Sequence, residues 1–209
     1  MKLPRLYAIA DAGFFPATES LLQFAQELAA GGVTLLQYRN KNGSARQILD
    51  QALGLRHTLP EHVHLILNDR ADLALAASFN GVHVGQDDLS PASVRNLIGP
   101  DRWLGASTHN PEQVRAANAT DADYIAIGPI FPTRSKANPD PVVGLAGIRR
   151  ARELTRKPLV AIGGITRENC RSAMDAGADS VAVISDLLGG PNSSPQAAAE
   201  HFLRLFAPA

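Results

Sequence analysis

The fold of this chain is decided by short apolar runs such as Val181-Ala182-Val183-Ile184, which is closed by a polar residue, Ser185. Eight such runs recur along the chain, and each is followed by an amphipathic or alanine-rich stretch. This alternation is typical of strand–helix units, and continuous apolar runs are typical of parallel strands covered by helices. The predicted strands are residues 6–10, 34–39, 64–69, 81–86, 103–107, 124–129, 158–164 and 180–185.

The segments between these runs carry helix-start signals. Ser44 precedes Gln47 in a capping-box pattern, and three other segments begin with a capping residue before a proline, at 90–91, 110–111 and 194–195. Eight strand–helix units in 209 residues predict a single (β/α)8 TIM barrel domain over residues 1–209. A doubly wound open sheet is the alternative, because repetition does not by itself show closure.

Composition excludes several classes of protein. Hydrophobic residues make up 45% of the chain, and 20 Lys plus Arg balance 20 Asp plus Glu, so no basic excess favours a nucleic-acid or anionic-membrane partner. The apolar runs are too short to span a membrane, and the start of the chain lacks a signal-peptide pattern. Cys170 is the single cysteine, which excludes an internal disulfide. We therefore expect a soluble, cytoplasmic protein.

Polar residues that would be costly in a core recur at the carboxyl ends of seven predicted strands. In a barrel these ends open onto one face, where the residues of an active site gather. One example is the alternation of Gln37, Arg39 and Lys41, which points all three side chains the same way along an extended backbone. An amide and two cations on one side suit a polyphosphate. A solvated strand end with salt bridges is the competing interpretation.

Two carboxylates follow neighbouring predicted strands, Asp69 in Asn68-Asp69-Arg70 and Asp88 in Asp87-Asp88. Facing each other at about 4 Å they would repel by about 4 kcal/mol at an effective dielectric constant near 20, so a cation is expected between them. Mg²⁺ bound through carboxylates and substrate phosphate oxygens is the natural candidate. Alternatively, Asp69 caps the next helix and Asp88 is a turn residue.

Three loops complete the predicted face. Residues 129–144 form an unusually long connection, typical of a lid, with hydroxyl and cationic side chains at Thr133, Ser135 and Lys136. The Gly163-Gly164 pair leads toward a helix, and Ser185 follows the last predicted strand. Phosphate sites in barrels commonly form from these last two loops.

The residue patterns typical of zinc sites and of nucleophilic catalysis are missing from the sequence. The six histidines show no zinc-ligand spacing, and no Gly-x-Ser-x-Gly nucleophile motif occurs. Cys170 lies inside a predicted helix, which favours a packing role. His83 alternates with Val82 and Val84, so a hydrogen-bonded histidine in the barrel interior is expected rather than a proton shuttle.

Seven ordered blocks of this sequence resemble the thiamine phosphate synthase family, over about residues 5–206. They are Gln37-Tyr38-Arg39-Asn40-Lys41, Asn68-Asp69-Arg70, 81–88, Gly105-Ala106-Ser107-Thr108-His109, 128–136, 161–165 and Val183-Ile184-Ser185. The resemblance implies a transferase that condenses hydroxymethylpyrimidine diphosphate with hydroxyethylthiazole phosphate and releases diphosphate. Its partners would be these small molecules, and a homodimer is an open alternative to a monomer because relatives often pair.

The resemblance also implies roles for individual residues. The pyrimidine diphosphate would be held by Gln37, Arg39, Lys41, Asn68, Ser107 and Lys136. Of these, Arg39, Lys41, Ser107 and Lys136 are the expected catalytic residues. Magnesium would be held by Asp69 and Asp88. The thiazole phosphate would be bound by Thr133, Arg134, Ser135, Gly164, Ile184 and Ser185.

Two residues depart from the family pattern. Asn40 stands where the family usually has an acidic residue, and Ser135 replaces a usual threonine. The nearest rival function is that of the related thiazole tautomerase, which has no diphosphate to expel and lacks the paired aspartates. A sugar-phosphate isomerase would have no need of Gln-x-Arg-x-Lys opposite two aspartates, and a catalytically silent barrel is the third alternative.

Overall fold

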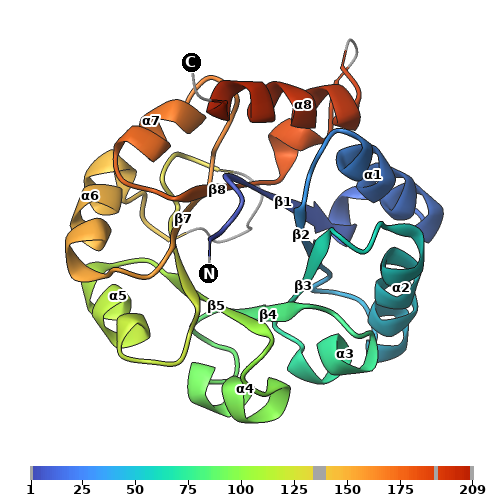
Figure 1. Cartoon of the computed structure of the whole chain (residues 1–209), viewed down its shortest axis with the longest axis horizontal. Coiled ribbons are helices and arrows are strands. Elements are labelled where there is room, and N and C mark those ends of the chain that lie inside the picture. The colour runs from blue at the N-terminus through green and yellow to red at the C-terminus, as the bar shows by residue number, and fades with distance from the viewer. Residues whose placement is uncertain (1, 134–139, 191–192, 208–209) are drawn as a thin grey trace.

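The computed structural model describes residues 2–133, 140–190 and 193–207, and its strands close into one parallel barrel (Figure 1). Each strand pairs with its neighbours in chain order, and β1 also pairs with β8. This closure confirms the predicted (β/α)8 barrel and excludes the open doubly wound sheet. The strands are β1 (Leu6–Asp11), β2 (Leu35–Arg39), β3 (His64–Asn68), β4 (Gly81–Val84), β5 (Trp103–Thr108), β6 (Tyr124–Ile127), β7 (Leu159–Ile162) and β8 (Ser180–Val183).

The α-helices form a ring around the strands (Figure 1). They are α1 (Thr18–Ala30), α2 (Ala45–Thr58), α3 (Ala71–Ala76), α4 (Pro91–Ile98), α5 (Pro111–Asn118), α6 (Gly144–Leu154), α7 (Cys170–Asp175) and α8 (Pro195–Phe206), with the 3-10 helices η1 (Ala12–Phe14) and η2 (Ser185–Leu187). The predicted caps are confirmed, because Ser44, Ser90, Asn110 and Ser194 each accept a hydrogen bond from the backbone N–H three residues on. Across the described ranges, no helix is both long and apolar enough to cross a membrane.

Alternate residues of each strand serve two separate cores. In β1, Tyr7 and Ile9 point into the barrel and pack in an inner cluster with Ile66, Tyr124 and Val160. Ala8 and Ala10 point outward and pack against the helices. This period of two is the physical reason that Gln37 and Arg39 share the barrel interior while Tyr38, between them, lies under the helices.

Several strands end earlier than the sequence predicts. β4 ends at Val84 because the Gly85 N–H turns to donate to the Asp88 carboxylate, at 2.8 Å, instead of continuing the ladder. β7 ends at Ile162 because Gly163 takes a left-handed backbone conformation, with φ of +96°. β6 and β8 also stop two residues short, whereas β1 and β5 run one residue longer. The last residues predicted for the shortened strands therefore belong to the loops at the carboxyl-terminal face of the barrel.

At the opposite, amino-terminal face of the barrel, the same pair of hydrogen bonds occurs three times. A residue just before each of β4, β6 and β8 accepts the backbone N–H of a leucine in the preceding strand and donates its own N–H to that leucine's carbonyl, all at 2.7–2.8 Å. The pairs are Asn80 with Leu65, Asp123 with Leu104, and Asp179 with Leu159. The strand pairs β3–β4, β5–β6 and β7–β8 are therefore fastened at their starts.

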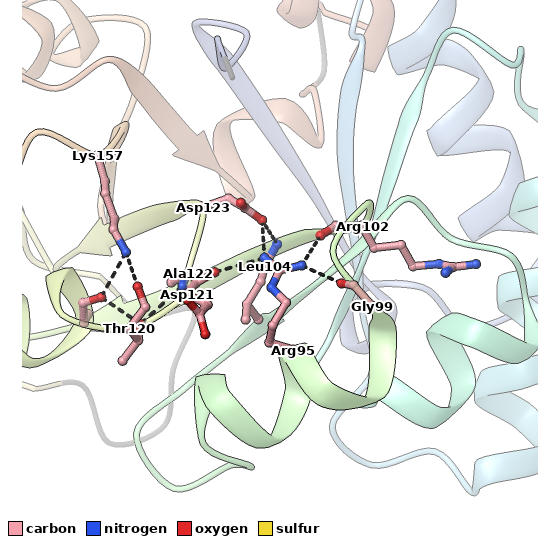
Figure 2. A network of polar contacts seen from close by, with 10 residues as sticks. Arg95, Gly99, Arg102, Leu104, Thr120, Asp121, Ala122, Asp123 and Lys157 are labelled. Atoms are coloured by element: carbon pink, nitrogen blue, oxygen red, sulfur yellow. Dashed lines mark hydrogen bonds and ion pairs between the residues drawn. The ribbon is translucent and has the colours of Figure 1, made fainter.

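At the amino-terminal face, which we call the base of the barrel, the Arg95 guanidinium adds hydrogen bonds beside β5 and β6. Figure 2 shows Arg95 donating to the carbonyls of Gly99 and Arg102, at 2.8 and 2.7 Å. Its other nitrogen donates to the Asp121 carbonyl and to the Asp123 carboxylate, at 3.0 and 2.7 Å. Each of these oxygens has a charged donor, which stabilises the loops that connect helix to strand.

Candidate active site at the barrel mouth

A cavity of about 480 Å³ lies at the carboxyl ends of the strands, within the size range of sites for small molecules. All eight strands, or the loops that follow them, contribute to its wall. The sequence predicts seven contributors, and the structure adds β1 through Tyr7 and Ile9. At the mouth, residues distant in the sequence therefore converge from all of the strand–helix units.

The structure places eleven of the predicted site residues around this cavity: Gln37, Arg39, Lys41, Asn68, Asp69, Asp88, Ser107, Thr133, Gly164, Ile184 and Ser185. The other three, Arg134, Ser135 and Lys136, lie outside the described residues. Among the eleven are two cations, two carboxylates and the two residues expected to begin the last two loops.

The cations on β2 are already paired with carboxylates. Arg39 donates to Asp11, a residue at the end of β1 that is only 5% exposed. Lys41 lies two residues further on and forms an ion pair with Asp69. Arg39 is mostly covered while the Lys41 side chain is 48% exposed, so Lys41 is the more accessible of the two to an entering anion.

Asn40 holds the turn that carries Lys41. Its side-chain oxygen accepts the backbone N–H groups of Asn42 and Gly43, at 3.2 and 2.8 Å. Its side-chain nitrogen donates to the Gln51 side-chain oxygen at 3.0 Å. An amide is suited to this position because it donates and accepts at once, which a carboxylate cannot do. The departure from the family pattern at Asn40 is thus matched by Gln51, a buried residue of α2.

Asp69 and Asp88 lie within hydrogen-bonding reach of each other. Burial, together with the hydrogen bond to Asp88, raises the pKa of Asp69 to about 6. Burial opposes ionisation of Asp88 as well, but its hydrogen bonds with Asp69 and with the Gly85 N–H lower its pKa below the usual range. The pair therefore holds a proton more tightly than two separate carboxyl groups, as expected where two like charges meet.

The backbone at Asp69 is in the left-handed region, with φ of +64°. Its N–H donates to the His83 carbonyl on β4 at 2.8 Å, which turns the chain back across the strand ends. Asp69 does not cap α3: Arg70 occupies that position, and no side chain in the described residues caps this helix. The capping alternative for Asp69 is therefore wrong, and a strained backbone holds its carboxylate in the mouth.

The two carboxylates fit a hard divalent cation better than a transition metal. The described residues contain no group of three or more His, Cys, Asp or Glu side chains that could hold a metal ion. Two carboxylates alone leave most coordination positions of a six-coordinate cation to water or to a bound phosphate. This donor set is the one that the sequence predicts for magnesium.

A buried chain of hydrogen bonds crosses the floor of the cavity. Gln37 donates to the Tyr7 hydroxyl at 2.9 Å, which lies 2.8 Å from the Tyr124 hydroxyl. His83 bonds to Tyr124 at 3.1 Å through one ring nitrogen and to the Ser107 hydroxyl at 2.8 Å through the other. Burial lowers the pKa of His83 to about 4, so the ring is neutral at physiological pH. Gln37 and Ser107 are thereby held from below.

Space for this chain comes from a missing side chain. A Cβ added at Gly105 would lie 2.2 Å from the Tyr124 ring and 2.4 Å from the His83 ring. Any larger residue would push the two rings apart. The prediction of a hydrogen-bonded, interior His83 is confirmed, and Gly105 is the position that makes room for it.

The loop after β6 rests on the loop after β7. The N–H groups of Ile130 and Phe131 donate to the carbonyls of Ile162 and Gly163, at 2.9 and 3.0 Å. A Cβ at Gly164 would lie 2.5 Å from the Pro132 carbonyl oxygen. These contacts bring Thr133 to the cavity, and His109, bonded to the Gly128 carbonyl at 2.7 Å, lines the same wall. The predicted lid, residues 129–144, is described only in part, because residues 134–139 lie outside the described residues.

The predicted helix after β7 is present, but it does not begin directly at the glycine pair. Gly163 and Gly164 are followed by a turn, and α7 starts only at Cys170, which is buried as expected of a packing residue. The η2 helix, in contrast, starts directly at Ser185 after β8. The predicted meeting of these two loops at the cavity holds, although no α-helix starts at the glycine pair.

Sequence reasoning missed Tyr7, which lines the cavity, and two residues that support its lining: Tyr124, which bonds to Tyr7 and His83, and Asp11, which pairs with Arg39. Both tyrosines occur within apolar strands and resemble core residues, and only the tertiary fold brings their hydroxyls together. Asp11 follows a predicted strand directly, so the rule that selects polar residues at strand ends would have found it.

Comparison with known proteins gives a consistent result. Residues 6–187 match the family model described as thiamine monophosphate synthase. The chain is 66% identical to the thiamine-phosphate synthase of Koribacter versatilis, over 91% of this chain and 92% of that protein. The identity with the thiamine-phosphate synthase of Shouchella clausii is 43%, over 90% of each.

Solved structures agree. The thiamine phosphate pyrophosphorylase of Pyrococcus furiosus superposes with a TM-score of 0.84 and 33% sequence identity, over 96% of this chain and 94% of that one. The alignment covers nearly the whole of each chain. The chain is therefore an enzyme of the thiamine-phosphate synthase family.

Proposed function

We propose that this enzyme joins hydroxymethylpyrimidine diphosphate to hydroxyethylthiazole phosphate in the mouth cavity. The carbon–oxygen bond to the diphosphate breaks, the diphosphate leaves with the electron pair, and the thiazole nitrogen forms the new bond to carbon. The observation that carries this proposal is the convergence of Arg39, Lys41, Asp69 and Asp88 on one small cavity. A site that only isomerised a monophosphate would have no need of this convergence.

The residues of β2, β3 and β5 are proposed to bind the pyrimidine diphosphate. Gln37 and Ser107 are fixed by the buried chain of hydrogen bonds, so they can hold a flat ring without first being ordered. Arg39 and Lys41 lie above Gln37 on the same face of the chain and are proposed to bind the departing diphosphate. Asn68 lines the cavity beside them, and Lys136 is assigned here by family resemblance alone.

Asp69 and Asp88 are proposed to hold Mg²⁺. The raised pKa of Asp69 supports this proposal, because Lys41 and the Gly85 N–H offset the charges of the two carboxylates only in part. When bound, the ion would supply charge stabilisation to the diphosphate as negative charge develops on it. Repulsion between the two carboxylates would be offset by the bound ion.

The thiazole phosphate is assigned to the opposite wall, at Gly164, Ile184 and Ser185 with Thr133. By family resemblance, Arg134 and Ser135 belong to the same subsite. Backbone groups near a glycine can approach an anion closely. The two substrates would thus lie on opposite walls, with the reacting atoms between them.

This chemistry needs no general base, because the thiazole nitrogen already carries a lone pair. The demand on the protein is electrostatic: it must stabilise a departing diphosphate and a developing pyrimidinylmethyl cation while excluding water. His83 agrees with this requirement, since it is neutral and both ring nitrogens are engaged in the cavity floor. Arg39, Lys41 and Ser107 are the described groups proposed to be catalytic.

The experiment that tests this function measures diphosphate release by the purified protein. Both precursors with Mg²⁺ should release diphosphate in equal amount to the thiamine phosphate formed, and a chelator should stop both. Neither precursor alone should react. A change in the thiazole phosphate when it is supplied alone would instead show tautomerase activity and overturn the proposal.

A matched pair of variants locates the site. Asp88→Ala should reduce diphosphate release at least about 100-fold, because the ion loses one of its two protein ligands. Asp179→Asn changes a carboxylate at the base of the barrel, which also accepts a backbone N–H and an arginine. It should keep full activity below its melting temperature. Normal turnover by Asp88→Ala would refute the metal assignment.

Three further predictions concern the protein as a whole. We expect residues 1–209 to form one domain that unfolds in one transition and to lie in the cytoplasm, and a homodimer stays the alternative to a monomer. Calorimetry tests the first, cell fractionation the second, and light scattering after size exclusion the third. A mass of about 22 kDa in solution would contradict the homodimer.

A further inference from the structure

The loops that follow β7 and β8 are joined by a side-chain pair that lies outside the cavity. The Asp186 carboxylate accepts the backbone N–H of Arg167 at 2.8 Å and its Nε at 3.0 Å on one oxygen. The other oxygen accepts Nη2 at 3.1 Å. Two parallel bonds between a guanidinium and a carboxylate fix both distance and orientation, and here a third bond ties the carboxylate to the main chain.

This pair is not needed to join the strands themselves. β7 and β8 are already in register through Val160 with Ser180 and Ile162 with Ala182. Arg167 and Asp186 lie beyond the last paired residues of each strand, where the two loops are free to separate. The contact therefore determines how the loops, rather than the strands, sit against each other.

A second side chain holds the glycine turn from within. The Asn169 side-chain nitrogen donates to the Gly164 carbonyl at 2.9 Å, and its oxygen accepts the Thr166 N–H at 2.8 Å. Gly164 has φ of +66°, a conformation that favours glycine. Asn169 thus holds this turn at both ends.

None of the three side chains lines the cavity, whereas Gly164 and Ser185 do. Gly164 is held by Asn169, and Ser185 is the immediate neighbour of Asp186. Any effect of these side chains on a bound anion must therefore pass through the positions of the two loops.

We propose that Arg167, Asp186 and Asn169 are positioning residues for the thiazole-phosphate half of the site, holding the two loops at the separation that a phosphate group requires. This inference rests on the proposed function, which assigns Gly164 and Ser185 to that phosphate. Binding groups that are already in place lose little freedom when the anion arrives, and a misplaced loop weakens binding. The pyrimidine half, built on β2 to β5, is independent of this pair.

The test is the effect of Asp186→Asn on each substrate separately. Asparagine keeps the size of the side chain but turns an N–H toward the guanidinium, so the forked pair is lost. The KM for thiazole phosphate should rise about tenfold. The KM for pyrimidine diphosphate and kcat at saturation should stay within about twofold, since the residues proposed for that half are untouched. An equal rise in both KM values, or a rise in neither, would overturn the proposal.

Asp179→Asn is the matched control, because this carboxylate also accepts an arginine, Arg152, and a backbone N–H, that of Leu159. It joins the same two strands at their other end. Its melting temperature should fall about as far as that of Asp186→Asn, with both KM values unchanged. If it raised the KM for thiazole phosphate equally, general loosening of β7 and β8 would explain the result, and the proposal would be wrong.

Graded substitutions sharpen the assignment. Arg167→Ala removes the fork but keeps the main-chain N–H that donates to Asp186. It should therefore raise the KM for thiazole phosphate less than Asp186→Ala, which removes all three bonds. Arg167→Lys keeps the charge and should give the smallest rise of the three. The reverse order would contradict a role through the loop connection.

Titration with inorganic phosphate separates this proposal from the proposed function, because it requires no turnover. The wild-type protein should bind phosphate at the mouth, and Asp186→Asn should weaken the affinity about tenfold while Asp179→Asn leaves it unchanged. This result would support the positioning role even if no thiamine phosphate were formed. Unchanged affinity in Asp186→Asn, or no binding by the wild type, would refute it.

Discussion

Aspartate side chains occur at both the base and the mouth of this barrel, but their charges are balanced differently in the two places. At the base, the Asp123 carboxylate accepts the Leu104 N–H and the Arg95 guanidinium, both at 2.7 Å, so its charge is matched (Figure 2). At the mouth, Asp69 faces another carboxylate, Asp88, and its pKa is raised to about 6. The comparison shows that matched charges stabilise the fold, whereas imperfectly matched charges remain able to bind a ligand.

The comparison also separates what a substitution should cost. At the base, losing one donor leaves oxygens without their partners, and the penalty appears in the free energy of unfolding. At the mouth, losing a cation removes repulsions as well as attractions within the free protein, so the penalty should appear mainly in catalysis. Enzymes commonly carry such a trade between stability and function in their active sites.

The largest expected effect is that of Lys41→Met at the mouth. The variant should lower kcat/KM at least about 100-fold, because a charge that stabilises the departing diphosphate is lost. Its melting temperature should move by less than about 3 °C, since an ion pair whose lysine is 48% exposed contributes little to stability. Steady-state kinetics and calorimetry on the same sample check both. A folded variant with near-normal kcat/KM would contradict the claim that the charge of Lys41 serves catalysis.

Arg95→Met at the base should show the reverse. Three carbonyls lose the guanidinium donor and the Asp123 carboxylate keeps only the Leu104 N–H, which we expect to lower the free energy of unfolding by about 2–3 kcal/mol and the melting temperature by about 5–10 °C. Activity at 25 °C should be unchanged. Loss of activity without loss of stability would contradict the separation of roles.

Asp69→Asn should stabilise the protein at alkaline pH. The folded carboxyl group has a pKa of about 6, above its value in the unfolded chain, so the folded state binds the proton more tightly. Wild-type stability should therefore fall as pH rises from about 4 to about 6, and the loss should be complete above that range. Asparagine does not ionise, so the variant should not lose this stability as the pH rises.

The measurement for Asp69→Asn is the melting temperature from pH 4 to pH 8 in the presence of a chelator. We expect the variant to exceed the wild type by about 2–4 °C at pH 8 and to lose that advantage near pH 4. In wild type, added Mg²⁺ should restore stability at pH 8, and in the variant it should have little effect. If the variant melts below the wild type at pH 8, the claim that repulsion between Asp69 and Asp88 destabilises the folded protein is wrong.

The smallest expected effect is that of Asn40→Asp. Aspartate still accepts the N–H groups of Asn42 and Gly43 but loses the bond that Asn40 donates to Gln51. The Lys41 turn should loosen, which we expect to raise the KM for pyrimidine diphosphate about threefold with little change in kcat. A tenfold fall in kcat would show a direct role for Asn40.

The outline of the fold could be predicted because strand and helix periods are local. The alternation of Gln37, Arg39 and Lys41 likewise places all three on the cavity wall without any tertiary information. Polar residues at strand ends also indicate the mouth, since these ends meet in any parallel barrel.

The rest depends on contacts between distant segments. The hydroxyls of Tyr7 and Tyr124 meet 117 residues apart in the sequence, and each alone is indistinguishable from a core aromatic. The late start of α7 depends on Asn169, whose side chain accepts the Thr166 N–H and keeps the glycine turn open. Such bonds compete with helix formation in a way that periodicity does not reveal.

Calorimetric titration of the protein with inorganic diphosphate, with and without Mg²⁺, tests the central claim most directly. If the mouth holds a polyanion through a divalent ion between Asp69 and Asp88, binding should be strong only with Mg²⁺, and Asp69→Asn combined with Asp88→Asn should abolish that dependence. The Asp179→Asn protein should bind like the wild type. Equal affinity with and without the ion, or Mg²⁺-dependent binding that survives loss of both carboxylates, would contradict it.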